Sequence, residues 1–168
     1  MSTWSILVGV VVSIGLSIGC GEVSSSDEDG GAGTVTVTLS QANSTIVTDG
    51  LGCTQNGTRY VSEMSFYRVF KLADYDISSS FHIKGVTFGL YSAVAGGDAT
   101  SQSALIRIYE YTGPTGGDAL DFEMFQMVSS TEFEQPDITT PTTIDVLMSA
   151  DIESGTETFI VDLYVPYG

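Results

Sequence analysis

The sequence predicts an all-β fold, an antiparallel β-sandwich of the jelly-roll kind with about seven or eight strands. Three observations lead to this prediction. From Thr34 onward apolar and polar residues alternate with a period of two. Gly-, Asp- and Asn-containing turn signals such as Asp49-Gly50 and Asn56-Gly57 separate the alternating runs. No segment of this region has the 3.6-residue period of an amphipathic helix.

The strands are expected in the following order. Residues 35–39 alternate Val or Leu with Thr, and residues 64–70 alternate Met, Phe, Arg and Phe with Ser, Tyr and Val. Residues 81–90 also alternate, but the phase slips at Gly85, which predicts a β-bulge there. Residues 72–76 are expected to form one helical turn. The remaining strands are expected at 106–108, 122–128, 144–148 and 159–165.

The N-terminal segment predicts export. Residues 4–19 are apolar and uncharged, Gly19 precedes Cys20, and an acidic Ser- and Gly-rich stretch follows. This arrangement resembles a bacterial lipoprotein signal, in which the cysteine becomes the lipidated mature N-terminus. We therefore expect a signal peptide at 1–19, a disordered tether at 20–33 and one β-sandwich domain at 34–168.

Two departures from that pattern leave alternatives open. No Lys or Arg precedes the apolar run, and Ser17 stands where such signals usually have Leu. A helix over residues 4–19 would span roughly 24 Å, which is short of a ~30 Å hydrocarbon core. The expected location is the cell envelope or cell surface through a lipid on Cys20. The alternatives are an ordinary secretory signal, and hence a secreted protein, or a short uncleaved membrane anchor.

Charge excludes several classes of partner. The chain has 21 acidic and 5 basic residues, and its formal net charge is −16. Such a charge repels nucleic-acid phosphates and anionic lipid head groups, so binding to either is not expected. It is typical of a soluble extracellular domain, and it also suits cation binding.

Two segments resemble an accessory domain of secreted bacterial multidomain proteins, often appended to subtilisin-like proteases. They are Phe66-Tyr-Arg-Val-Phe-Lys-Leu-Ala-Asp-Tyr75 and Phe81-His-Ile-Lys-Gly-Val-Thr-Phe-Gly-Leu90. Arg107-Ile-Tyr109 and the segment from Gly155 to Gly168 fit the later strands of the same pattern. The resemblance covers residues 53–168. It implies a β-sandwich without catalytic residues, so no activity is carried over.

The resemblance also implies that part of the domain is missing. Similar domains continue for several tens of residues beyond the position of Gly168, and a cysteine equivalent to Cys53 commonly pairs in that segment. We therefore expect an incomplete domain with an unpaired thiol at Cys53 and marginal stability. A Cys20–Cys53 disulfide in an unlipidated protein is the alternative.

Catalytic motifs are not found in the sequence. His82 is the single histidine, and it alternates with Phe81 and Ile83, which predicts a solvent-facing strand position. The chain has no Gly-x-Ser-x-Gly elbow, no cluster of Cys and His for zinc, and no phosphate-binding loop. We expect a protein that is not an enzyme.

Calcium is the one cofactor that the sequence leaves open. Asp98, Asp118, Asp121 and Glu123 lie in or beside Gly-rich loops, and calcium binds carboxylate and loop carbonyl oxygens. Their spacing does not match an EF-hand. We expect no cofactor, with these four residues as weak candidates for a calcium site.

Two further groups of residues stand out. Arg68 shares a face with Met64 and Phe70, so we expect a structural role in which Asp74 or Asp76 balances its charge. Four tyrosines are expected to be core or cross-strand residues, with a sugar-stacking platform as the alternative. They are Tyr60, Tyr67, Tyr109 and Tyr111.

Taken together, these features predict a non-catalytic, surface-anchored module with a structural or adhesion role. Its membrane partner is the lipid anchor at Cys20, and a protein or glycan partner is not identified by the sequence. The alternative is a carbohydrate- or calcium-dependent binding module. Tyrosines gathered on one exposed face would favour that alternative.

Overall fold

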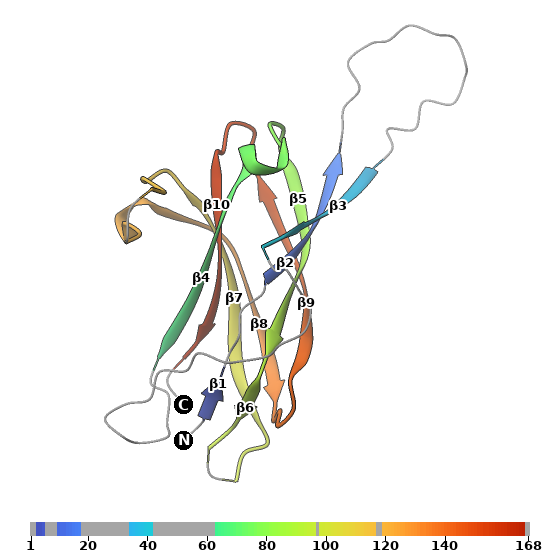
Figure 1. The fold of residues 1–168 in the computed structure, drawn as a ribbon, viewed down its shortest axis with the longest axis vertical. Helices are drawn as coiled ribbons and strands as arrows, with labels where there is room; N and C mark the ends of the chain where they lie inside the picture. Colours follow the sequence, from blue (N-terminus) through green and yellow to red (C-terminus); the bar gives the residue numbers. More distant parts are fainter. Residues whose placement is uncertain are drawn as a thin grey trace, which may run out of the picture.

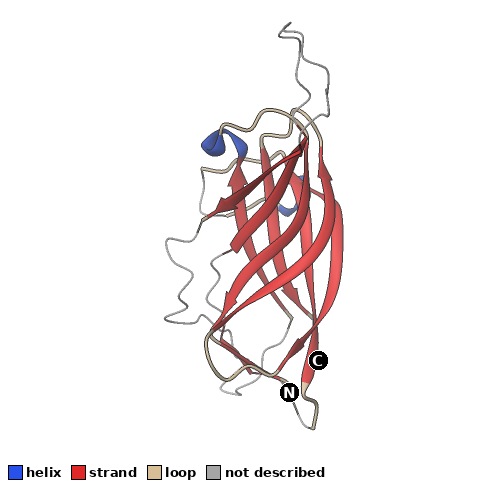
Figure 2. Ribbon diagram, turned by 90° about the vertical axis from the view of Figure 1, so that its right-hand side faces the viewer, coloured by secondary structure: helices blue, strands red, loops and turns tan. Residues whose placement is uncertain are grey.

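The computed structural model describes residues 3–5, 10–17, 34–41, 63–96, 98–116 and 119–166 and is an antiparallel β-sandwich (Figure 1). Two four-stranded sheets face each other, and their strands run along the long axis of the molecule (Figure 2). Every strand pairing is antiparallel. The all-β antiparallel sandwich expected from the period-two pattern is confirmed.

The first sheet, called sheet I, has the strand order β4-β10-β7-β8. Its strands are β4 (Met64–Lys71), β10 (Thr158–Val165), β7 (Ser101–Tyr111) and β8 (Phe125–Pro136). The most apolar of these strands, β10, lies between β4 and β7, where both of its edges are paired. β4 and β8 form the two edges of the sheet.

The second sheet, called sheet II, has the order β3-β2-β5-β9. It consists of β3 (Thr34–Ser40), β2 (Val10–Ser17), β5 (Phe81–Leu90) and β9 (Thr142–Ile152). A small separate ribbon pairs β1 (Thr3–Ser5) with β6 (Ser92–Val94).

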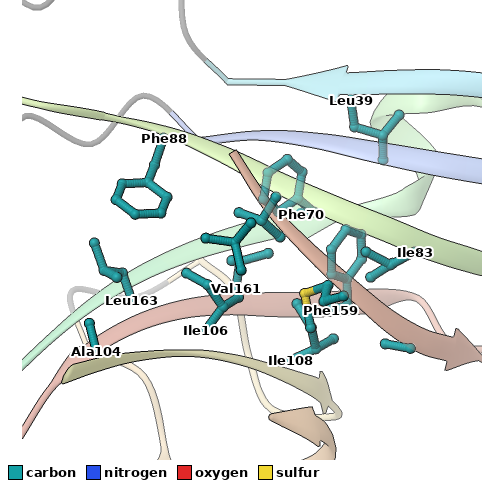
Figure 3. Close-up of a cluster of buried hydrophobic side chains, with 14 of the residues drawn as sticks. Leu39, Phe70, Ile83, Phe88, Ala104, Ile106, Ile108, Phe159, Val161 and Leu163 are labelled. Carbon is teal, nitrogen blue, oxygen red and sulfur yellow. The ribbon is translucent and has the colours of Figure 1, made fainter. Parts of the chain in front are cut away.

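The core fills the space between the two sheets (Figure 3). Phe70 of β4 stacks on Phe159 of β10, with ring centres 4.9 Å apart, and Phe81 meets Phe159 edge to face. Alternate residues of β7, β9 and β10, together with residues of β5 and Leu39 of β3, supply most of the remaining buried surface. The fully buried members include Leu39, Ile83, Phe88, Ile106, Ile108 and Val161.

The expected bulge in β5 is confirmed. The register between β5 and β9 shifts between Ile83 and Gly85, so the strand changes phase there. A side chain at Gly85 would come within 3.1 Å of the carbonyl oxygen of Val146, and glycine avoids this crowding. The helical turn after β4 is also present, as η1 (Leu72–Tyr75).

One expected strand begins later than the sequence suggests. Residues 122–128 were expected to be extended, but Phe122–Met124 form the 3-10 turn η2, and β8 begins at Phe125 and continues to Pro136. The carboxylate of Asp121 accepts a hydrogen bond from the backbone N–H of Glu123 and so caps this turn.

β2 lies within the segment that the sequence analysis assigns to a signal peptide. In the full chain it pairs with β3 from Val11 to Ser17 and with β5 from Val10 to Gly15, so it occupies an inner position of sheet II. Removal of residues before Cys20 would therefore remove an inner strand. Within the described ranges no helix is long and apolar enough to span a membrane.

Candidate functional site: the outer face of sheet I

The solvent-facing side of sheet I carries an unusual set of side chains, and the strand register defines them. Asp162 of β10 lies directly opposite Tyr67 of β4 and Arg107 of β7. Directly opposed residues share one face of a sheet, and every second residue along each strand joins them. Tyr164 of β10 and Tyr109 of β7 therefore lie on this face as well.

Asp162 is the buried acid of this face. Its exposed fraction is 0 %, although its neighbours in the strand, Val161 and Leu163, point into the core. Its Oδ2 accepts a hydrogen bond from the hydroxyl of Ser65 at 3.4 Å and lies 3.8 Å from Nη1 of Arg107. Its Oδ1 has no hydrogen-bond partner among the described residues. A buried carboxylate oxygen without a donor is costly to keep ionised.

The electrostatics follow from this arrangement. Burial raises the pKa of Asp162 to about 6, against the opposing effects of Arg107, the Ser65 hydroxyl and the Phe66 backbone. Burial also raises the pKa of Tyr109, and the nearby Asp162 adds to this shift. The distance of 3.8 Å between Arg107 and Asp162 explains why the ion pair does not fully offset the loss of water.

Arg107 extends the network of Asp162 from β10 to β7. Its guanidinium carbon lies 3.4 Å from the centre of the Tyr164 ring, which is a close cation–π contact. The hydroxyl of Tyr164 donates a hydrogen bond to Oε1 of Glu63 at 2.6 Å. The network thus joins β4, β7 and β10 across the sheet, and 23 % of the Arg107 side chain remains exposed.

An aromatic cluster lies at one end of this network and is centred on Phe125. Its ring contacts four others, with centre distances of 5.1 to 5.6 Å. Tyr67, Tyr109 and Tyr111 approach edge to face, whereas Phe122 of η2 lies nearly parallel to Phe125 at 5.2 Å. Edge-to-face and offset contacts are the favoured arrangements of aromatic rings.

The loop between β7 and β8 holds Phe122 over this cluster. The hydroxyl of Tyr111 donates to the carbonyl of Pro114 and accepts from the backbone N–H of Asp121, so both sides of the loop are tied to the end of β7. In Figure 1 this loop is the ochre excursion between β7 and β8. Phe122 is 64 % exposed, and Met127, which faces Tyr109 across the strands, is 57 % exposed.

We call Tyr67, Tyr109, Phe122, Phe125 and Met127 the aromatic zone. Towards the other end of the same face lie exposed carboxylates of Glu63, Glu132 and Glu134, which we call the acidic zone. Glu132 and Glu134 of β8 lie opposite Leu105 and Ser103 of β7, which are on the same face of the sheet as Arg107. The Arg107–Asp162 pair lies between the two zones.

His82 lies on the outer face of sheet II, as the alternation predicts, but it is not isolated. Its Nδ1 lies 2.7 Å from Oδ1 of Asp151, and its Nε2 lies 3.4 Å from the hydroxyl of Ser149. This is the order of groups in a serine nucleophile relay. The side chain of Asp151 is exposed to solvent, so water has access to the array.

The candidate calcium ligands do not come together. Asp98 precedes β7 and Asp121 follows its far end, and an 11-residue strand is roughly 36 Å long. Glu123 neighbours Asp121, whose carboxylate caps η2. Asp118 lies outside the described residues. In the described part of the chain no group of three His, Cys, Asp or Glu side chains is placed to hold a metal ion.

Arg68 lies on the core side of β4, as expected, and is half-buried. Its Nη1 donates to the carbonyl of Tyr67 at 3.4 Å, and burial lowers its pKa. Asp74 lies in the first turn of η1 and raises the pKa of Tyr75 as the smallest of three effects, after burial and Gln41. The ion pairs found among the described residues are His82–Asp151 and Arg107–Asp162, and neither involves Asp74 or Asp76.

Like Asp118, three further residues singled out in the sequence lie outside the described ranges: Cys20, Cys53 and Tyr60. Of the remaining tyrosines, Tyr67 and Tyr109 share the outer face of sheet I, whereas Tyr111 is 3 % exposed beneath its loop. The interpretation as cross-strand aromatic contacts therefore fits all three, and two of them also border solvent.

Asp162, Arg107 and Tyr164 were not identified as site residues from the sequence. Asp162 interrupts the otherwise apolar run of β10, and a charged residue in such a strand is the one sequence feature that could have indicated it. Its partners could not be identified without the register of three strands that are distant in the sequence.

Comparisons with known proteins give no match: no known family describes this sequence, and no curated protein or solved structure is significantly similar to it.

Proposed function

We propose that this chain is a non-catalytic, surface-displayed β-sandwich module with an adhesion role, and that the outer face of sheet I is its contact surface. The observation that carries the proposal is the exposed aromatic zone. Phe122 and Met127 are both more than half exposed beside Tyr67, Tyr109 and Phe125. Large apolar side chains that gather on one exposed face indicate an interaction site.

The kinds of residue favour a protein partner. Aromatic residues, Met and Arg are enriched at the centres of protein–protein interfaces, where Lys is depleted. The aromatic zone and Arg107 have this composition. Phe125, held by four rings, supplies a rigid base that loses little side-chain entropy on binding.

Attachment to a surface is the second half of the proposal. The apolar run, Gly19-Cys20 and the acidic tether support a lipid anchor at Cys20 in the cell envelope. The resemblance of residues 53–168 to accessory domains of secreted bacterial proteins supports a module without catalysis.

The proposal is tested by displaying the full chain on bacteria and measuring attachment to plates coated with collagen or fibronectin. Phe122→Ser should reduce attachment to a protein-coated plate at least about fivefold, because it removes an exposed apolar anchor. Leu147→Ser is the matched control, since Leu147 is 85 % exposed on sheet II. Equal effects of the two substitutions, or no attachment to either coating, would contradict the proposal.

A carbohydrate-binding module is the second candidate, because Tyr67 and Tyr109 share one face that borders solvent. Plates coated with cellulose or chitin test it in the same assay. Attachment to a polysaccharide that is lost in Tyr109→Ala, with none to protein coatings, would replace the first candidate by the second.

A further inference from the structure

The outer face of sheet I has chemically different side chains at its two ends. The aromatic zone lies toward the β7–β8 loop, and the acidic zone lies toward the opposite end of the sheet. Along β8 the distance from Phe125 to Glu134 is nine residues, or roughly 30 Å in an extended strand. A partner that covers both zones must therefore place apolar and charged groups about that far apart.

We propose, resting on the proposed adhesion role of this face, that its partner is a basic amphipathic protein segment. The segment places apolar side chains on the aromatic zone and Lys or Arg side chains over the acidic zone. A segment of about nine residues as a strand, or about 20 as a helix, spans the required length.

Charge is the first argument for a basic partner. The chain has a formal net charge of −16, which steers cationic partners toward it. On this face Arg107 is already engaged by Asp162 and Tyr164, and Lys71 lies at the far end of β4 from Glu63. The ion pairs among the described residues are His82–Asp151 and Arg107–Asp162, so the carboxylates of Glu63, Glu132 and Glu134 form no ion pair with a described basic side chain.

Asp162 is the second and independent argument. Its Oδ1 is fully buried between the two zones and has no donor among the described residues. A donor group that approaches through the layer of Arg107, Tyr67 and Tyr109 would supply the missing hydrogen bond. Binding of a cation would then favour the ionised form of Asp162, whose burial otherwise disfavours it.

Other features of the face agree with this partner. The hydroxyl of Ser103 donates to Oε1 of Glu132, which fixes that carboxylate on the outer face. Tyr164 donates to Glu63 and fixes a second carboxylate at the same end. Acids held in place lose less side-chain entropy when a cationic partner arrives.

The test uses three fluorescent ten-residue peptides with Phe and Leu at one end. The other end carries four Lys, four Gln or four Glu. Anisotropy titrations with the full chain should show that the Lys peptide binds at least about tenfold more tightly than the Gln peptide and that 0.5 M salt removes this advantage. The Glu peptide should bind most weakly.

Matched variants separate a site from general charge attraction. Glu132→Gln with Glu134→Gln removes two carboxylates from the acidic zone, and Asp145→Asn with Asp151→Asn removes two exposed carboxylates from sheet II. The first pair should weaken binding of the Lys peptide at least about fivefold and the second pair less than about twofold. Equal weakening, or equal affinity of the Lys and Gln peptides, would overturn the inference.

Failure of this inference and failure of the adhesion role give different results. If Phe122→Ser abolishes attachment to protein-coated plates but the Lys peptide binds no better than the Gln peptide, the adhesion role stands and the basic partner is wrong. If Phe122→Ser changes neither attachment nor peptide binding, the aromatic zone is not the contact surface, and both proposals fail.

Discussion

The guanidinium of Arg107 lies 3.4 Å from the ring centre of Tyr164, and this contact crosses from β7 to β10. The same guanidinium lies 3.8 Å from the carboxylate of Asp162. A positive charge is therefore placed between an aromatic face and a buried acid. Asp162 is the least solvated of these three residues. Its protonation state therefore has the largest effect on the stability of the outer face.

We predict that Asp162→Asn changes how stability depends on pH. A raised pKa means that the folded state holds the proton more tightly than the unfolded state, whose pKa is near 3.8. This stabilising contribution is complete below pH 3.8 and is lost as the pH rises through about 6. The wild type should lose up to roughly 3 kcal/mol over this range relative to Asp162→Asn.

Urea unfolding at intervals between pH 3.5 and 7.5 measures this difference. Leu147→Ser is the control, because it changes an exposed side chain of the other sheet without removing a titratable group, and its curve should run parallel to that of the wild type. If Asp162→Asn also runs parallel, burial does not raise the pKa of Asp162 in the folded protein.

The two phenylalanines of the aromatic zone should differ in their contribution to stability. Phe125→Ala removes a ring that contacts four others and should cost about 2–3 kcal/mol, less than a fully buried phenylalanine because Phe125 is half-buried. Phe122→Ala removes a ring that is 64 % exposed and should cost less than about 1 kcal/mol. Thermal or urea unfolding gives both values, and equal costs would contradict the central role of Phe125.

Most of the sandwich could be predicted because alternation and turn residues are local properties. Residues 64–70 and 159–165 were placed within a residue or two of β4 and β10, and the slip at Gly85 was identified from phase alone. The start of β8 was missed because Phe122 is apolar, yet its backbone forms the η2 turn capped by Asp121.

The candidate site could not be predicted in the same way. Asp162, Tyr67 and Arg107 meet only because β10 lies between β4 and β7, and sequence separation gives no information on that order. Arg68 attracted attention because it shares a face with core residues, whereas the cation of the buried ion pair is Arg107. Strand order, a tertiary property, decided which charges became partners.

We predict that the chain does not hydrolyse esters, peptides or glycosides. Ser149, His82 and Asp151 have the order of a nucleophile relay, but they lie on a solvent-facing strand surface. Such a relay depends on groups that stabilise the oxyanion and on exclusion of water. Turnover of p-nitrophenyl acetate and labelling by a fluorophosphonate should be the same in the wild type, Ser149→Ala and His82→Ala. Turnover that is lost in both variants would show that the relay is active.

The last prediction concerns Cys20 and strand β2. Expression in a bacterial host should yield a membrane-bound form whose N-terminus is a lipidated Cys20, as mass spectrometry of the membrane fraction would show. Cys20→Ser blocks lipidation and should keep residues 10–17 attached. A soluble wild-type product that still carries Ser17, or an unmodified Cys20, would contradict the lipoprotein prediction.

The processed and unprocessed forms should then differ in sheet II. In the full chain β2 is the partner strand of β3 and one of the two neighbours of β5, so the processed form lacks both pairings. We expect a lower urea midpoint for the processed form than for Cys20→Ser, because an exposed strand edge loses its hydrogen bonds. Hydrogen exchange locates the effect: amides of β5 that face β2 should exchange faster in the processed form, while those that face β9 should be less affected. Equal protection along both edges of β5 in the two forms would mean that β2 contributes nothing to the folded sheet.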